Sequence, residues 1–215
     1  MRAVLLSFLV IFLVSCEQTS VEYLWAKPLE TDGKDAMILS FPESVQLGNG
    51  ANLIASAKWN ANLGECEIQR SMIEFDLSEI PSDARILYAE MRLFNAYKDE
   101  LETNSEGGSQ NECVIRRITE DWNEHEVNWL NQPEATNEHQ VFTKATSADR
   151  ENLSVDITRL VDDMKLHGNH GLMIQLADET GNRRQAYASS DAFDEQFHPE
   201  LIVEYEITTN PLGSH

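Results

Sequence analysis

The chain has 215 residues, of which 41% are hydrophobic, so it is long enough for one domain and too apolar to be disordered as a whole. It has 37 acidic and 16 basic residues, and its net charge of -21 at pH 7 argues against nucleic acid as a partner. Phosphate groups would be repelled by such a surface, whereas the same acidity helps to keep an exported protein soluble.

The first part of the chain has the features of an export signal. Residues 1–15 hold one positive charge, followed by an apolar run at 3–14 that would rise only about 18 Å as a helix, well short of a hydrocarbon core of roughly 30 Å. Cys16 follows a small residue and resembles the lipobox of bacterial lipoproteins, in which the thiol is lipidated and the chain is cleaved before it. Glu17 is not the aspartate that retains many such proteins in the inner membrane. We therefore expect an outer-membrane lipoprotein that faces the periplasm or the cell surface; the alternative is an ordinary signal peptide with a chance cysteine.

Residues 16–31 have no strong pattern and are interpreted as a tether, followed by a single domain over residues 32–209. In this domain, short runs with strand character alternate with Gly, Asn, Asp, Ser and Pro clusters. The runs are 36–40, 52–58, 70–77, 85–97, 113–118, 153–156, 172–177, 185–189 and 201–207. Apolar and polar residues alternate in several of them, which is typical of an antiparallel sheet with one solvated face.

One segment has helical spacing instead. Ile157, Leu160, Val161 and Met164 recur at the intervals of an amphipathic helix, and Gly168 follows as a stop signal. The pattern as a whole predicts an all-β fold, an antiparallel, jelly-roll-like β-sandwich with one short helix across one end.

Two further cysteines, Cys66 and Cys113, lie inside the predicted domain. An exported compartment permits disulfides, and an even pair of cysteines favours one. Neither residue has a histidine or a second cysteine at zinc-ligand spacing. We therefore predict a disulfide between them.

Several motifs follow one another in a distinctive order. They are RSMIEFDLSEIP at 70–81, RITEDWNE at 117–124, VNWLNQP at 127–133, DITRLV at 156–161, SSD at 189–191 and PELIVEY at 199–205. This order and spacing resemble the DNRLRE-type domains, which are grouped with carbohydrate-binding module family 96, over roughly residues 32–207. The resemblance implies a β-sandwich of a secreted or surface protein and, for some members, a polysaccharide ligand such as alginate. The negative charge of this chain argues against a polyuronate.

Four residues of these motifs are interpreted as structural. Trp122 and Trp129 lie beside polar turn formers, where a buried indole would seal one end of a sandwich and donate its N–H to a backbone carbonyl. Arg70 and Asp76 open and close a predicted core strand, and we expect an ion pair or a turn cap from each.

A glycan site needs an exposed aromatic plane for the C–H face of a sugar and planar amide or guanidinium groups for its hydroxyls. Two loops offer this mixture: Trp59, Asn60 and Asn62 in the first, and Arg183, Arg184 and Tyr187 in the second. We predict that a sugar binds there, with Trp59 or Tyr187 as the stacking platform.

No motif requires a cofactor. Carboxylate groups are abundant, however, and calcium often stabilises the loops of exported β-sandwich proteins. Asp35, Asp191 and Asp194 are the candidate ligands, provided that the beginning and the end of the domain meet.

No motif indicates an enzyme. The chain has no GxSxG elbow, no HExxH pair and no glycine loop that would cradle phosphate. We therefore predict a non-catalytic carbohydrate-binding module, tethered by the lipidated Cys16, with a polysaccharide or oligosaccharide as its partner. The alternative is a structural or adhesive envelope protein with no sugar ligand.

Overall fold

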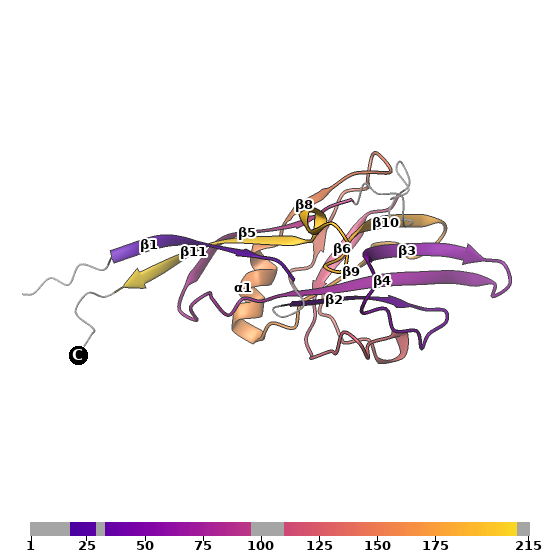
Figure 1. The fold of residues 1–215 in the computed structure, drawn as a ribbon, viewed down its shortest axis with the longest axis horizontal. Helices are drawn as coiled ribbons and strands as arrows, with labels where there is room; N and C mark the ends of the chain where they lie inside the picture. Colours follow the sequence, from indigo (N-terminus) through magenta and orange to yellow (C-terminus); the bar gives the residue numbers. More distant parts are fainter. Residues whose placement is uncertain (1–17, 29–32, 96–109, 210–215) are drawn as a thin grey trace, which may run out of the picture.

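The computed structural model describes residues 18–28, 33–95 and 110–209, which form two antiparallel β-sheets and one α-helix (Figure 1). This is the predicted all-β sandwich with a single short helix. The predicted signal sequence and the lipidation site Cys16 lie outside the described residues. In the described part of the chain, no helix is long and apolar enough to cross a membrane.

The first sheet has four strands in the order β1-β11-β5-β8. They are β1 (Gln18–Ala26), β11 (Glu200–Thr209), β5 (Arg85–Leu93) and β8 (Leu153–Asp156). Side chains alternate strictly along β11: Leu201, Val203 and Tyr205 are buried, whereas the intervening residues face outward. One face of this sheet therefore packs on the core and the other meets solvent, as the alternation in the sequence predicts.

The second sheet has seven strands, with the path β10-β3-β4-β9-β6-β7 and β2 paired with β4. They are β2 (Gly33–Leu39), β3 (Asn52–Asn60), β4 (Glu65–Phe75), β6 (Cys113–Arg117), β7 (Val141–Phe142), β9 (Leu172–Leu176) and β10 (Arg183–Ala188). Strand β3 pairs with residues 65–69 of β4, and β2 pairs with residues 69–75 of the same strand. The two strands therefore lie on opposite edges of β4, where Leu39 of β2 and Ser56 of β3 both face Gln69, and the end of β2 lies beside the β3–β4 hairpin.

The main core lies between the two sheets. Apolar side chains of both sheets meet there, and the helix adds Leu160, Val161 and Met164 to them. A second, smaller apolar cluster covers the other face of the larger sheet, where Met72 and Met173 pack against Trp122 and Val127. The larger sheet is thus buried on both faces over part of its area, which leaves only its margins free for a ligand.

Helix α1 (Thr158–His167) contacts β5 of the first sheet and β6 of the second. The Asp156 carboxylate accepts hydrogen bonds from the backbone N–H and the hydroxyl of Thr158, at 2.9 and 2.6 Å. Gly168 ends the helix with a φ of 103°, a backbone conformation that side chains disfavour. The predicted helix and its stop signal are confirmed.

The segment interpreted as a tether is partly a strand, which corrects that prediction. Residues 18–26 form β1, and each of them pairs with a residue of β11, from Gln18 opposite Thr209 to Ala26 opposite Leu201. Leu24 and Ala26 point into the main core. The sandwich therefore includes residues 18–26, because β11 is long enough to accept a partner strand along its whole length.

The predicted disulfide is not formed, since the structure has both Cys66 and Cys113 as free thiols. Cys66 lies on β4 opposite Trp59, whereas Cys113 lies on β6, with β9 between the two strands. Two strand spacings alone separate them by roughly 10 Å, beyond the ~7 Å between Cα atoms that a disulfide allows. Burial raises the pKa of the Cys113 thiol far above its usual range, so this residue is an inert part of the core.

Candidate functional site

A groove of about 550 Å³ lies at the free end of the β3–β4 hairpin, where β10 and the end of β2 adjoin it. Its floor is a row of cross-strand neighbours on four strands: Arg184, Ser56, Gln69 and Leu39. Residues on paired strands that lie opposite one another share a face of the sheet, so this row presents its side chains to the groove together. The row brings residues from both halves of the chain into one site.

Two exposed aromatic residues line this groove: Trp59 is 54% exposed and Phe41 is 51% exposed. Trp59 lies near the end of β3, and its backbone N–H donates a 3.0 Å hydrogen bond to Oδ1 of Asn182. This bond ties the β3 end to the turn before β10. The strand is held in place while the indole remains at the surface, which is the arrangement expected of a stacking platform.

Basic side chains of Lys58, Arg183 and Arg184 also line the groove. Arg183 forms an ion pair with the Asp178 carboxylate and donates to the Asp178 carbonyl at 3.2 Å. These contacts orient the guanidinium. Hydrogen bonds from the Thr180 hydroxyl and from Arg183 lower the pKa of Asp178. One carboxylate, Glu67, lines the groove as well, so the site is locally basic in an acidic protein.

The structure brings together only part of the predicted glycan loops. Asn60 shapes the hairpin turn: its Oδ1 accepts from the N–H groups of Asn62 and Leu63, and its Nδ2 donates to Glu67 at 2.5 Å. Asn62 is exposed in this turn and does not line the groove. Trp59, Arg183 and Arg184 are therefore the predicted residues that meet there.

Tyr187 is a core residue, which corrects its prediction as a stacking platform. It is 3% exposed, and its hydroxyl donates to Oε1 of Gln185 at 2.8 Å. Burial raises the pKa of the phenol far above its usual value. Its position along β10 decides this, because residues 185–188 are all buried, whereas Arg183 and Arg184 at the start of the strand are half-buried.

A second polar site joins three carboxylates. The side-chain oxygens of Asp35, Glu124 and Asp191 all lie within 4.8 Å of one another. Asp35 and Asp191 were predicted as calcium ligands, and the condition that the two ends of the domain meet is fulfilled. Asp194 lies apart from them: its carboxylate accepts from the backbone and side chain of Gln196 and caps the short 3-10 helix η2 (Glu195–Phe197).

Asp35 is almost fully buried in this cluster, at 1% exposure. Burial, together with repulsion from Asp191 and Glu124, raises its pKa to about 7, although the carboxylate accepts a 2.7 Å hydrogen bond from the N–H of Ser190. Burial also raises the pKa of Glu124, whose Oε1 accepts from the N–H of Asp35 at 2.9 Å. A divalent cation would relieve the repulsion, and carboxylate oxygens are the ligands that Ca²⁺ prefers.

Close packing fixes the position of Glu124. A Cβ atom added to Gly48 would lie 2.1 Å from the Glu124 carbonyl oxygen, so the two backbones approach more closely than any other residue at position 48 would allow. The sequence prediction missed Glu124, although it lies in the RITEDWNE motif at 117–124. No spacing signal could have identified it, because it is 89 residues from Asp35.

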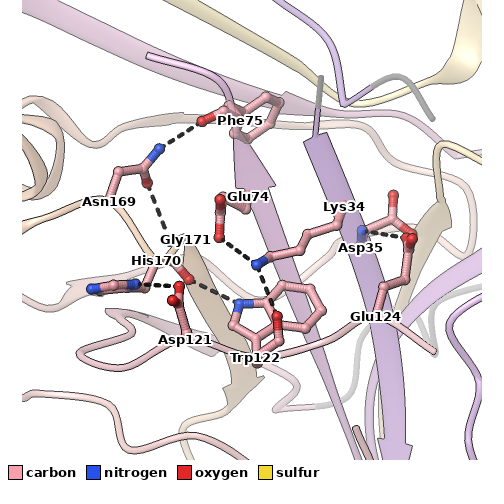
Figure 2. A network of polar contacts seen from close by, with 10 residues as sticks. All are labelled: Lys34, Asp35, Glu74, Phe75, Asp121, Trp122, Glu124, Asn169, His170 and Gly171. Carbon is pink, nitrogen blue, oxygen red and sulfur yellow. Dashed lines mark hydrogen bonds and ion pairs between the residues drawn. The ribbon is translucent and has the colours of Figure 1, made fainter. Parts of the chain in front are cut away.

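Beside this cluster, a polar network seals one end of the sandwich (Figure 2). Trp122 is 8% exposed and its indole N–H donates to the His170 carbonyl at 2.9 Å, as predicted. Lys34 lies 4.7 Å from the Trp122 ring, donates to the Trp122 carbonyl at 2.9 Å and pairs with Glu74 at 3.1 Å. The ring nitrogen Nδ1 of His170 lies 2.9 Å from the Asp121 carboxylate. Trp122 is thus fully engaged and has no face left for a ligand.

The other motif residues also have structural partners. Arg70 donates two 2.8 Å hydrogen bonds to the Glu179 carboxylate, and its guanidinium lies 4.6 Å from the Trp129 ring. The Asp76 carboxylate accepts from the N–H and the hydroxyl of Ser78, which confirms the predicted turn cap.

An all-β sandwich with an exposed indole beside basic groups in an open groove has the architecture of a binding module. A family model described as "Carbohydrate-binding module family 96" matches residues 31–205 of the chain. The chain therefore belongs to carbohydrate-binding module family 96. No curated protein that was compared with the chain matches it.

Proposed function

We propose that this protein is a non-catalytic module that binds polysaccharide or oligosaccharide in the Trp59 groove. Its family supports carbohydrate as the ligand class. The observation that carries the choice of site is the 54% exposed indole of Trp59 beside a groove of about 550 Å³. An open groove with an aromatic ring favours this function over a structural or adhesive envelope protein, for which we expect a convex and evenly acidic surface.

The groove offers the two kinds of contact that a sugar needs. The Trp59 ring can stack on the C–H face of a pyranose, and burial of that face is favourable because both surfaces are apolar. The guanidinium group of Arg184 and the amide of Gln69, which share one face of the sheet, can hydrogen-bond to hydroxyls or ring substituents. The aromatic contact supplies affinity, and the polar groups supply orientation.

Binding without turnover fits the acidic groups of the groove. Glycoside hydrolysis uses a pair of carboxyl groups that flank the scissile bond. Glu67 is the one carboxylate that lines the groove in the described part of the chain, and it already accepts a hydrogen bond from Asn60. The groove therefore lacks the second carboxyl group of that mechanism.

The proposal includes a structural calcium ion at Asp35, Glu124 and Asp191. An ion there would connect β2, the 110–135 region and the turn after β10, which are distant in sequence. We expect chelation with EDTA to lower the melting temperature and calcium to restore it, with no such effect in the Asp35→Asn variant. Asp194→Asn, a change outside the cluster, is the control and should respond like the wild type. A melting temperature that is the same with EDTA and with calcium rules this ion out.

We also propose that the protein is attached to the outer membrane through acylated Cys16. Strand β1 begins at Gln18, so little chain lies between the anchor and the sandwich. Metabolic labelling with radioactive palmitate should mark the wild type, and Cys16→Ser should lose the label and leave the membrane fraction. A Cys16→Ser variant that still carries the label contradicts the anchor.

A glycan array tests the function itself. The full chain, purified in detergent, is applied to neutral and acidic glycans beside the variants Trp59→Ala and Arg184→Ala. Phe142→Ala, which removes an exposed aromatic ring on β7 outside the groove, is the matched control. We expect the wild type and the control to bind the same glycan and Trp59→Ala to lose it. No binding by the wild type, or equal binding by Trp59→Ala, overturns the proposed site.

A further inference from the structure

The solvent face of the four-stranded sheet carries a second group of exposed aromatic residues. Tyr23 is 67% exposed, Trp25 is 64% exposed and Tyr88 is 39% exposed. Tyr23 and Trp25 lie on β1, and Tyr88 lies on β5, with β11 between these strands (Figure 1). These three residues form a surface that we call the β1 platform. It lies on the opposite sheet from the Trp59 groove.

The strand register places the rings on one face and close together. Tyr23 pairs with Glu204, and Glu204 pairs with Tyr88 in the next strand, so the two tyrosines flank one glutamate. Trp25 is two residues from Tyr23, about 7 Å along the strand, and Tyr88 is two strand spacings, roughly 10 Å, from Tyr23. Side chains that project from one face of a sheet form a single layer, so the platform is open and shallow.

These rings are not required by the core. The inward residues of the same strands, among them Leu24, Val203 and Ala89, already fill the space below the sheet. Large exposed aromatic side chains that cluster on a protein surface indicate a binding site more often than a lone exposed residue does. Strand β1, with Tyr23 and Trp25, lies outside the family match at residues 31–205, whereas Tyr88 lies within it.

The polar groups around the rings define the chemistry of the ligand. Glu206 pairs with Arg85 at 3.1 Å, and Glu90 pairs with Arg92. Glu204, between the two tyrosines, has no ion pair or side-chain hydrogen bond among the residues that the structure describes. Its oxygens can therefore accept hydrogen bonds from a ligand above the sheet.

The remaining neighbours add negative charge and a donor. Asp156 lies opposite Glu90 on β8 and is exposed. Burial and the carboxylates of Glu90 and Asp156 raise the pKa of the Tyr88 phenol, and its hydroxyl can donate to a ligand. A surface of this charge repels uronate and sulfate groups, whereas hydroxyl groups can donate to its carboxylates.

We propose that the β1 platform is a second carbohydrate-binding surface, which takes a neutral polysaccharide by stacking on Tyr23, Trp25 and Tyr88 with Glu204 as a hydroxyl acceptor. The open and nearly flat form of a sheet face suits an extended, insoluble chain better than a short oligosaccharide. The platform and the groove then differ in local charge, since the platform is acidic and the groove carries Lys58 and Arg184. A protein with both surfaces can hold two polymer chains at once.

Retention on microcrystalline cellulose and on insoluble β-1,3-glucan tests this inference, with calcium-gelled alginate as the anionic probe. The full chain in detergent is compared with the double variant Tyr23→Ala/Trp25→Ala, with Trp25→Phe and with Trp59→Ala. We expect the double variant to lose about tenfold or more of its retention on a neutral polymer, Trp25→Phe to keep most of it and Trp59→Ala to keep all of it. Melting temperatures of all variants establish that each is folded, since the two substituted side chains are mostly exposed.

The outcomes separate this surface from the groove and from other occupants. No retention of the wild type on either neutral polymer overturns the inference, whatever the array reports for Trp59. Equal retention of the wild type and the double variant also overturns it. If the double variant instead converts a dimer to a monomer in sedimentation analysis and keeps its retention, the face is an interface between two copies and not a glycan surface. Retention on alginate that depends on Trp25 contradicts the proposed neutral ligand.

Discussion

Trp122 and Trp59 are both tryptophans, but one is buried and the other is exposed. Trp122 is 8% exposed, packs in the second apolar cluster and donates its indole N–H to the His170 carbonyl. Trp59 is 54% exposed at the rim of a groove. The difference teaches that an aromatic residue in a β-sandwich is structural when its N–H and both faces have partners, and is available for a ligand when they do not.

The largest expected effect is the loss of the Trp122 ring. Trp122→Ala leaves a cavity at the sealed end and removes a buried hydrogen bond, so we expect the free energy of unfolding to fall by about 3–5 kcal/mol. Urea unfolding measures this change. Trp122→Phe keeps most of the ring and leaves the His170 carbonyl without its donor, and it should lose only about 1–2 kcal/mol. A stability of Trp122→Ala close to that of the wild type would remove the distinction between the two tryptophans.

The acidic cluster beside Trp122 should make the sealed end sensitive to pH. The pKa of Asp35 is raised from 3.8 to about 7 in the folded protein, so folding favours its protonated form. The stabilisation that this provides is complete below about pH 3.8 and is lost as the pH rises through about 7.

In EDTA, deprotonation of Asp35 should lower the free energy of unfolding by up to about 4 kcal/mol as the pH rises from about 4 to about 8. Asp35→Asn removes this part of the pH dependence, and Asp194→Asn keeps it. Urea titrations at a series of pH values compare the three proteins. Identical pH profiles for the wild type and Asp35→Asn would place the titrating group elsewhere.

A smaller effect is expected at Arg70, which stacks on Trp129 and pairs with Glu179 through side chains that are 20% and 18% exposed. Arg70→Ala should lower the free energy of unfolding by about 2 kcal/mol, since both the bidentate pair and the ring contact are lost. Arg85→Ala is the matched control. The Arg85 side chain is 68% exposed in its pair with Glu206, so its removal should change stability by no more than about 0.5 kcal/mol. Thermal or urea unfolding measures the loss of stability in both variants. Equal losses in Arg70→Ala and Arg85→Ala would show that the Arg70 pair does not stabilise the fold.

The smallest effect on stability is expected at Trp59. Trp59→Ala removes a mostly exposed ring and leaves the backbone hydrogen bond to Asn182 intact. The free energy of unfolding should therefore change by about 0.5 kcal/mol or less. The same variant should lose binding on the glycan array. A large loss of stability in Trp59→Ala would show that this ring, too, is part of the framework.

Much of the fold could be predicted from local patterns. Each of the nine predicted runs overlaps a strand of the structure, because alternation of apolar and polar residues is a property of a few consecutive positions. The helix was predictable for the same reason, from the spacing of Ile157, Leu160, Val161 and Met164 and from Gly168. The roles of Trp122, Arg70 and Asp76 followed from their places beside turns and at strand ends.

The candidate sites were only partly predictable. Trp59, Arg183 and Arg184 all line the groove, whereas Tyr187 lies in the core because residues 185–188 of β10 are buried on both faces of the strand. Tyr23 and Trp25 gave no signal, since the apolar residues of β1 occur on both of its faces and its only pairing partner among the described strands is at the other end of the chain.

The sequence by itself determined the class of the fold, the order of its strands along the chain and its family resemblance. Tertiary structure decided which strands became neighbours, and therefore which carboxylates face one another and which cysteines stay apart. The physical reason is that strand identity depends on residues that are adjacent in the chain, whereas a site such as Asp35, Glu124 and Asp191 depends on sheet pairing between segments many residues apart.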